Sequence, residues 1–136
     1  MFINPIYKRI IMALINFQSQ FAKAVEDGTK RQTIRAHRKY PIKTGEMLHL
    51  YTECRTKKAR KLKSIICLSV QNIIISELQY EVQIPGEDGF VPIHYLDCLD
   101  CLDRFAQADG FKNWILMIRW FANTHGLPFK GTLIKW

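Results

Sequence analysis

Residues 28–35 bring together a glycine, cations and a hydroxyl at spacings that can do chemistry. Gly28 follows an amphipathic segment and is predicted to end a helix in the left-handed conformation. Thr33 and Arg35 then share one face of a short strand, because strand side chains alternate. Lys30 joins them only if it still lies in the turn after Gly28. A lysine, a threonine hydroxyl and an arginine brought together would form an anion-binding pocket or an activated nucleophile.

The elements that must position this motif follow from the spacing of apolar residues. Ser19 is the expected N-cap of the helix that Gly28 ends, and residues 112–124 carry the pattern of another helix. The β-branched run 65–75 favours a single central strand. Strands are predicted over residues 13–17, 33–35, 47–51, 65–75, 79–84, 89–95 and 127–136. No linker interrupts these elements, so they indicate one α+β domain.

Two C-terminal segments carry helical patterns. Leu96, Leu99 and Leu102 repeat in threes and would line one helical face, with aspartates on another. The apolar stripe within 112–124 comprises Trp114, Met117, Ile118 and Phe121, widened by Ile115, Leu116 and Trp120. We interpret this stripe as packed core rather than as a cage for a ligand.

Composition and charge narrow the possible classes of protein. The chain has 136 residues and a net charge of +8, which suits one folded domain and favours polyanionic partners such as nucleic acid. No apolar run reaches the length needed to cross a membrane. Lys8 and Arg9 interrupt the apolar N-terminal segment, which argues against a signal peptide. We therefore expect a cytoplasmic protein without a membrane partner, with residues 1–12 as an N-terminal extension.

One interpretation of the cysteines is a metal site. The four cysteines are too few for the disulfide framework of a small secreted protein, and reduced thiols are expected. His94, Cys98 and Cys101 could hold zinc, but the chain has no second CxxC pair to complete the site. The alternative is that the cysteines pack as small apolar residues. No metal and no cofactor are therefore expected.

A basic run lies between two predicted strands. It has six cations within nine residues, namely Arg55, Lys57, Lys58, Arg60, Lys61 and Lys63. One interpretation is a solvated loop. The other is a nucleic-acid-binding patch whose contacts with the phosphate backbone set register and make binding steeply salt-dependent.

The order of several segments resembles a known family. Gly28, Lys30, Thr33 and Arg35 fit the pattern G-x-K-x-x-T-x-R, and residues 40–50, 105–111 and 129–136 look like the family's later segments. In this respect residues 13–136 resemble the ASCH domain family of the PUA-like superfamily. The resemblance implies a small β-barrel with two or three flanking helices.

This resemblance also implies a function. Some ASCH proteins are small amidohydrolases acting on acylated cytidine, and others process or bind RNA. By position, Lys30, Thr33 and Asp109 look like the catalytic set of the hydrolases, which carry a glutamate at the last place. Gly28, Arg35 and Arg38 are expected to bind the ligand.

Two classes of function remain open at this point. In the first, the protein is an amidohydrolase of an N-acylated cytidine, in which Thr33 attacks and Lys30 or Asp109 acts as the base. In the second, a non-catalytic RNA-binding module uses the pocket and the basic run 55–63. A metal-dependent ribonuclease is a variant of the first class. Its carboxylates would be Asp97, Asp100 and Asp103.

Asp109 and Thr33 also have purely structural interpretations. Asp109 precedes Gly110 and the helix of residues 112–124, so it could cap that helix or hold a turn. Thr33 could be an ordinary strand residue. The sequence does not decide whether burial lowers the pKa of Lys30 more than the Asp109 carboxylate raises it.

Overall fold

The computed structural model describes residues 13–84, 88–94 and 96–136. Within them, strands form two sheets. The first sheet has the order β1 (Leu14–Phe17), β3 (Met47–Thr52) and β4 (Arg60–Ile66). The second has the order β2 (Gln32–Arg35), β8 (Phe129–Lys135), β5 (Ser69–Ile75), β6 (Gln79–Gln83) and β7 (Phe90–His94). The helices are α2 (Ser19–Asp27), α3 (Leu99–Ala108) and α4 (Trp114–Thr124). The expected extension, residues 1–12, lies outside this part of the chain.

The expected α+β class is confirmed, whereas a closed barrel is not. In the described residues, β1 and β4 remain the edges of the first sheet, and β2 and β7 those of the second. The two sheets pack through side chains instead. Ile134 and Val70 of the second sheet contact the cluster that contains Leu48 and Leu50 of the first.

The prediction of one strand over residues 65–75 was wrong. The run divides into the end of β4 and the whole of β5, which belong to different sheets. The backbone changes partner at the junction, because the Cys67 N–H donates to Glu46 O and the Leu68 N–H donates to Lys135 O. The sequence hides this change, because apolar residues lie on both sides of the junction.

Three other predictions were confirmed. Strands β6 and β7 form the expected antiparallel hairpin. Gly28 ends α2 with a φ of 86°. The α4 stripe is buried at Trp114, Met117, Ile118 and Phe121.

The predicted widening of the α4 stripe was wrong at two positions, because Ile115 and Leu116 are exposed. The leucine repeat was also only partly correct, since Leu96 lies before α3 and is exposed, whereas Leu102 is buried.

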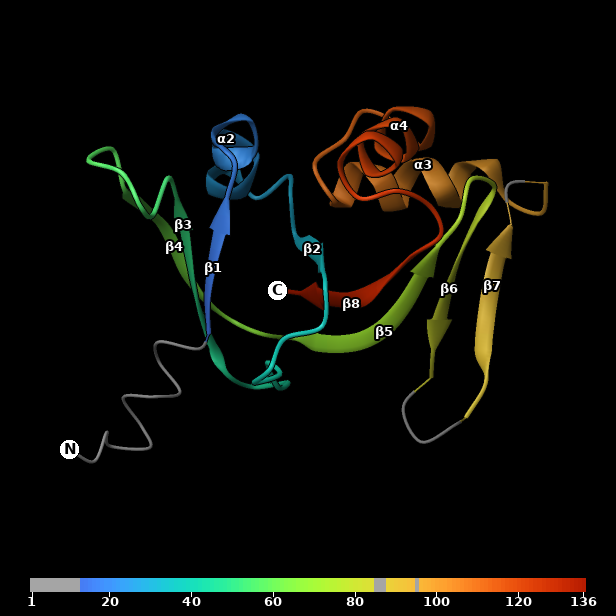
Figure 1. The fold of residues 1–136 in the computed structure, drawn as a ribbon, viewed down its shortest axis with the longest axis horizontal. Helices are drawn as coiled ribbons and strands as arrows, with labels where there is room; N and C mark the ends of the chain where they lie inside the picture. The colour runs from blue at the N-terminus through green and yellow to red at the C-terminus, as the bar shows by residue number, and fades with distance from the viewer. Residues whose placement is uncertain (1–12, 85–87, 95) are drawn as a thin grey trace.

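Two apolar clusters hold the fold together, and β8 contributes to both. Figure 1 shows α3 and α4 covering one face of the five-stranded sheet, while α2 lies beside β1. Leu133 belongs to the cluster under α3 and α4, and its neighbour Ile134 belongs to the cluster under α2. Successive strand residues face opposite sides, so β8 and its partner β2 lie where the two clusters meet. In the described residues, no helix has the length and apolarity needed to span a membrane.

Candidate functional site

Lys30 lies in the turn between α2 and β2, as the motif requires. The left-handed Gly28 ends the helix, and the Lys30 N–H then donates to Ala24 O at 2.9 Å. The Asp27 carboxylate accepts from the backbone N–H of Thr29 at 2.9 Å, which closes the turn. As a result the Lys30 side chain points inward and is buried.

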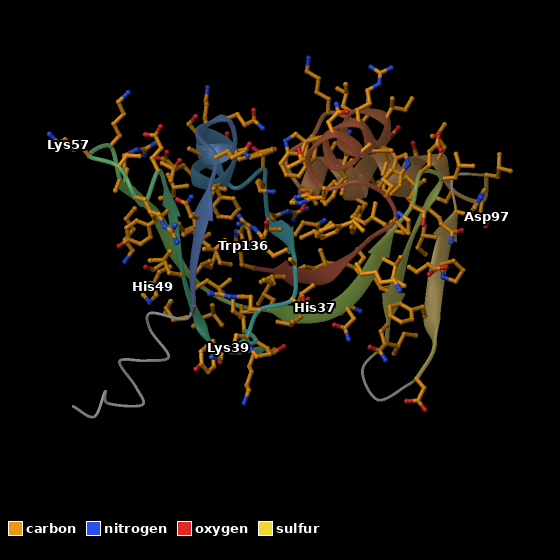
Figure 2. All side chains as sticks on the ribbon, viewed as in Figure 1. His37, Lys39, His49, Lys57, Asp97 and Trp136 are labelled. Carbon is orange, nitrogen blue, oxygen red and sulfur yellow. A yellow bond between two sulfur atoms is a disulfide. The ribbon has the colours of Figure 1, made fainter. Side chains whose placement is uncertain are left out.

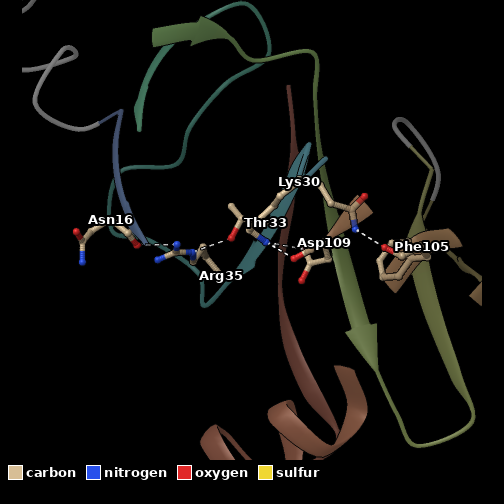
Figure 3. Close-up of polar contacts among 7 residues, drawn as sticks. Asn16, Lys30, Thr33, Arg35, Phe105 and Asp109 are labelled. Atoms are coloured by element: carbon tan, nitrogen blue, oxygen red, sulfur yellow. Dashed lines mark hydrogen bonds and ion pairs between the residues drawn. The ribbon is translucent and has the colours of Figure 1, made fainter. Parts of the chain in front are cut away.

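Thr33 and Arg35 share a face of β2 and contact each other directly. The Arg35 Nε–H donates to Thr33 Oγ1 at 3.0 Å, and Nη2 donates to Asn16 O at 2.7 Å (Figure 3). The guanidinium also lies 4.9 Å from the centre of the Phe17 ring. Arg35 is therefore held between β1 and Thr33, and its positively charged guanidinium donates to the threonine hydroxyl oxygen.

A close approach of two strands supports this arrangement. A Cβ on Gly131 of β8 would lie 2.3 Å from the carbonyl oxygen of Arg35. Real Cβ contacts do not reach that distance, so a glycine is required for β2 and β8 to pair here. Gly131 thereby helps to hold β2 at the position that the site needs.

Asp109 reaches Lys30 from the far end of the chain. It is the C-cap residue of α3, and the Arg31 N–H donates to Ala108 O at 2.8 Å beside it. Lys30 Nζ donates to the carbonyl oxygen of Asp109 and lies 3.7 Å from its Oδ1. The suggestion that Asp109 caps the helix after it was wrong, because Asn113 is the N-cap of α4.

Burial dominates the electrostatics of this pair. Desolvation lowers the pKa of Lys30, and the Asp109 carboxylate only partly opposes that effect. Desolvation raises the pKa of Asp109 to about 6, against the lowering influence of Lys30 and Arg35. Oδ1 of Asp109 is buried without a hydrogen-bond partner among the described residues. It is therefore free to accept a proton or an N–H group from a bound molecule.

A pocket of about 190 Å³ opens beside these groups. Lys30, Thr33, Arg35 and Asp109 contribute its polar wall. The rest of the wall includes Asn16 and the rings of Phe17, Phe21, Phe111, Trp120, Phe121 and His125. A polar corner within aromatic walls is the usual composition of a small-molecule site. The arrangement can orient a flat ring and place a hydroxyl, an amine and a carboxylate beside it.

The aromatic wall was missed in the sequence. Trp120 and Phe121 were assigned to the packed core, whereas both also line the pocket. Phe21 packs edge-on against Phe111 and Trp120, with ring centres 5.4 and 5.9 Å apart. These rings come from α2, from α4 and from the turn between α3 and α4. Spacing within one helix could not reveal that they meet.

The other predicted ligand residues lie around this pocket rather than in it. Gly28 is absent from the pocket wall and serves the turn that positions Lys30. Arg38 lines a neighbouring cavity, which it shares with Arg35. The structure therefore gathers Lys30, Thr33, Arg35 and Asp109, and leaves Gly28 and Arg38 at the margin.

The basic run does not form one loop, and none of its residues lines the pocket. Arg55, Lys57 and Lys58 lie in the loop 53–59, which connects β3 to β4, and Figure 2 shows Lys57 on that loop. The prediction of a connection was wrong for Arg60, Lys61 and Lys63, because these three lie in β4. Arg60 is also paired with Glu26 at 2.6 Å.

Several of the side chains proposed as alternative metal ligands have other partners. No group of three histidine, cysteine or carboxylate residues suited to a metal occurs in the described part of the chain. Asp103 accepts from the Trp114 N–H at 3.0 Å, and Asp100 pairs with Arg104. The expectation of reduced thiols was wrong for Cys98 and Cys101, which form a disulfide. Their CxxC spacing places the two sulfurs across the first turn of α3.

No known family model, no curated protein and no solved structure matches this chain. Its function must therefore be argued from the site itself.

Proposed function

We propose that this protein binds a modified nucleoside in the pocket beside Lys30, Thr33 and Asp109, and hydrolyses an N-acylated cytidine. The observation that carries the proposal is the buried pair of Lys30 and Asp109 on the wall of an aromatic pocket. Buried ionisable groups with shifted pKa values cluster at functional sites. Membership of the ASCH family, with its PUA-like barrel, forms part of the proposal and is supported by the motif at residues 28–35.

The size of the pocket favours a single ring over a larger ligand. Its volume of about 190 Å³ is below the range of roughly 300–1,000 Å³ that drug-sized molecules occupy. A pyrimidine with a short acyl group is a flat molecule with polar edges. The aromatic wall offers stacking surfaces for its faces, and the polar wall offers partners for its edges.

The Asp109 carboxylate suits the role of a base, because its Oδ1 accepts no hydrogen bond from a described residue and has only the Lys30 amine 3.7 Å away. With a pKa of about 6, Asp109 is largely ionised at neutral pH. In the proposed first step, Thr33 Oγ1 attacks the acyl carbon and its proton passes to Asp109, directly or through water. Arg35 assists because its N–H donates to the attacking oxygen. Lys30 Nζ donates an N–H to the acyl oxygen and stabilises the negative charge that develops there.

The remaining steps complete the acyl transfer, first to Thr33 and then to water. Asp109 returns the proton to the departing amine of cytidine, which breaks the C–N bond and leaves an ester on Thr33. Water then gives a proton to Asp109 and attacks the ester. The C–O bond to Thr33 breaks, and Thr33 recovers the proton. The products are cytidine and a carboxylic acid.

The test measures acetate released from N4-acetylcytidine by the parent protein and by isosteric variants. We expect Thr33→Val, Lys30→Met and Asp109→Asn each to lower turnover by at least about 100-fold, the effect typical of a proton-transfer group. Thr52→Val is the matched control, because Thr52 is also a buried strand threonine but does not line the pocket. Its hydroxyl donates to the backbone carbonyl oxygen of Phe17. Thermal unfolding of each variant separates lost chemistry from lost folding.

Two outcomes would change the proposal. Turnover that survives Thr33→Val while Lys30→Met abolishes it would make water the nucleophile. Binding of the nucleoside without any turnover by the parent protein would contradict the hydrolase. The protein would then be a non-catalytic RNA-binding module, the second candidate. Its supporting observation is the exposure of the loop cations Arg55, Lys57 and Lys58, which form no ion pair with a described residue.

A further inference from the structure

A second cavity adjoins the proposed nucleoside pocket where β2 ends. Its volume is about 160 Å³, and Arg35 and Ala36 line both cavities. This is room for several water molecules, each of which occupies about 30 Å³ in the liquid. The second cavity can therefore hold a compact polar group attached to a molecule in the first.

Polar side chains from three neighbouring strands converge on the second cavity. Thr132 of β8 lies opposite Arg35 of β2 and also opposite Asn72 of β5. Residues directly opposite each other share a face of the sheet, so these three side chains form a row. His37 follows β2 and its Nδ1 lies 3.1 Å from Thr132 Oγ1. Arg38 completes the lining on the same side.

The two arginines of this cavity lack a close negative partner. In the described part of the chain, no carboxylate oxygen lies within 4 Å of either guanidinium. The hydrogen bonds of Arg35 go to Asn16 O and Thr33 Oγ1, and that of Arg38 goes to Leu14 O at 3.4 Å.

Charge and burial both favour an anion between these guanidiniums. Burial lowers the pKa of both guanidiniums, and the carboxylates of Asp109 and Glu46 oppose that effect only in part, at Arg35 and Arg38 respectively. The positive charge of Arg38 also lowers the pKa of Arg35, by less than Asp109 raises it. An anion between the guanidiniums would relieve their mutual repulsion.

We propose that the second cavity binds the phosphate of a nucleotide whose base occupies the first pocket. This inference rests on the proposed function and narrows its ligand from a free nucleoside to a phosphorylated one. The paired N–H groups of an arginine guanidinium match the geometry of phosphate oxygens, and Asn72 and Thr132 add neutral donors. Arg35 connects the two cavities, since it holds Thr33 on one side and faces the phosphate on the other.

The test compares binding of N4-acetylcytidine with binding of its 5′- and 3′-monophosphates by titration calorimetry at constant ionic strength. We expect one monophosphate to bind at least about tenfold more tightly than the nucleoside, as hydrogen bonds between charged groups allow. Arg38→Gln should remove most of that gain, so that the monophosphate binds the variant little more tightly than the nucleoside does. Lys39→Gln is the matched control, because it removes one charge from the adjacent position, which does not line the cavity.

Equal binding of nucleoside and monophosphates by the parent protein would overturn the subsite. So would an equal loss in Arg38→Gln and Lys39→Gln, since that result means attraction by net charge alone. A trinucleotide with N4-acetylcytidine at its centre separates the two sources of phosphate. Tighter binding of the trinucleotide than of either monophosphate identifies RNA, and weaker or equal binding identifies a mononucleotide.

The hydrolase and the subsite fail in different ways. If the parent protein gains affinity from phosphate but hydrolyses neither ligand, the hydrolase is wrong and the subsite stands. If it hydrolyses the nucleoside and phosphate brings no gain, the hydrolase stands and the subsite is wrong. If neither ligand binds, both are wrong.

Discussion

Replacing Lys30 with methionine would leave the Asp109 carboxylate buried without its cation. Both side chains are only 4% exposed, and Nζ lies 3.7 Å from Oδ1. Removing one partner of such a buried pair destabilises proteins by about 3–5 kcal/mol, because an uncompensated charge stays behind. We therefore expect Lys30→Met to lower the free energy of unfolding by about 3 kcal/mol at pH 7. Asp109→Leu should cost a similar amount by leaving the Lys30 amine alone.

The double variant should recover much of this loss. Holding Asp109 ionised is itself unfavourable, since its pKa is raised from 3.8 to about 6. At neutral pH that shift corresponds to roughly 3 kcal/mol of lost stability. An apolar pair removes both desolvation costs, and such replacements are often neutral or stabilising. We expect Lys30→Met/Asp109→Leu to unfold near the parent value while showing no turnover.

The assay is urea unfolding of the parent, both single variants and the double variant at pH 7. The coupling free energy is the difference between the double variant and the sum of the singles. The matched control is the cycle for Arg60 and Glu26, whose atoms lie 2.6 Å apart but whose side chains are 54% and 41% exposed. Its coupling should stay below about 1 kcal/mol. A double variant that loses the full sum of the single effects would refute the reasoning.

Three further predictions concern pH, the turn at Gly110 and the basic loop. The raised pKa of Asp109 means that the folded state holds this proton more tightly than the unfolded state. The free energy of unfolding should therefore decrease as the pH rises from about 4 to about 6, and Asp109→Asn should lose that slope. Urea titrations at a series of pH values measure it. A Cβ at Gly110 would lie 3.0 Å from Lys30 Cδ, so Gly110→Ala should lower both stability and turnover. Gly45→Ala, with a similar φ and open space, should lower stability alone by about 1–2 kcal/mol. Reversing the three charges in the loop 53–59 should flatten the salt dependence of RNA binding by about 0.7 per lost contact, and an unchanged slope would exclude the loop from binding.

Local patterns in the sequence predicted the elements that build the site. The glycine after α2 and the alternation of β2 placed Lys30 in a turn and Thr33 beside Arg35, as the structure shows. The same reasoning was wrong over residues 65–75, where two strands of different sheets form one apolar run. Apolar spacing reports that a side chain is buried. It does not report which sheet buries it.

The polar wall of the pocket was predictable only in part. Asp109 came from the family resemblance, and the sequence alone favoured a helix cap for it. The aromatic wall was missed because Phe21, Phe111 and Trp120 each fit an ordinary apolar stripe. Three separate elements must pack before these rings surround a space, so no single segment carries the signal.

The sequence by itself determined the turn, the strand face and the apolar stripes, because these depend on residues a few positions apart. Only the tertiary structure decided that Lys30 meets Asp109, which lies 79 residues away. It also decided the depth of burial that lowers the pKa of Lys30 and raises that of Asp109. Desolvation depends on everything packed around a group, and here that packing comes from both ends of the chain.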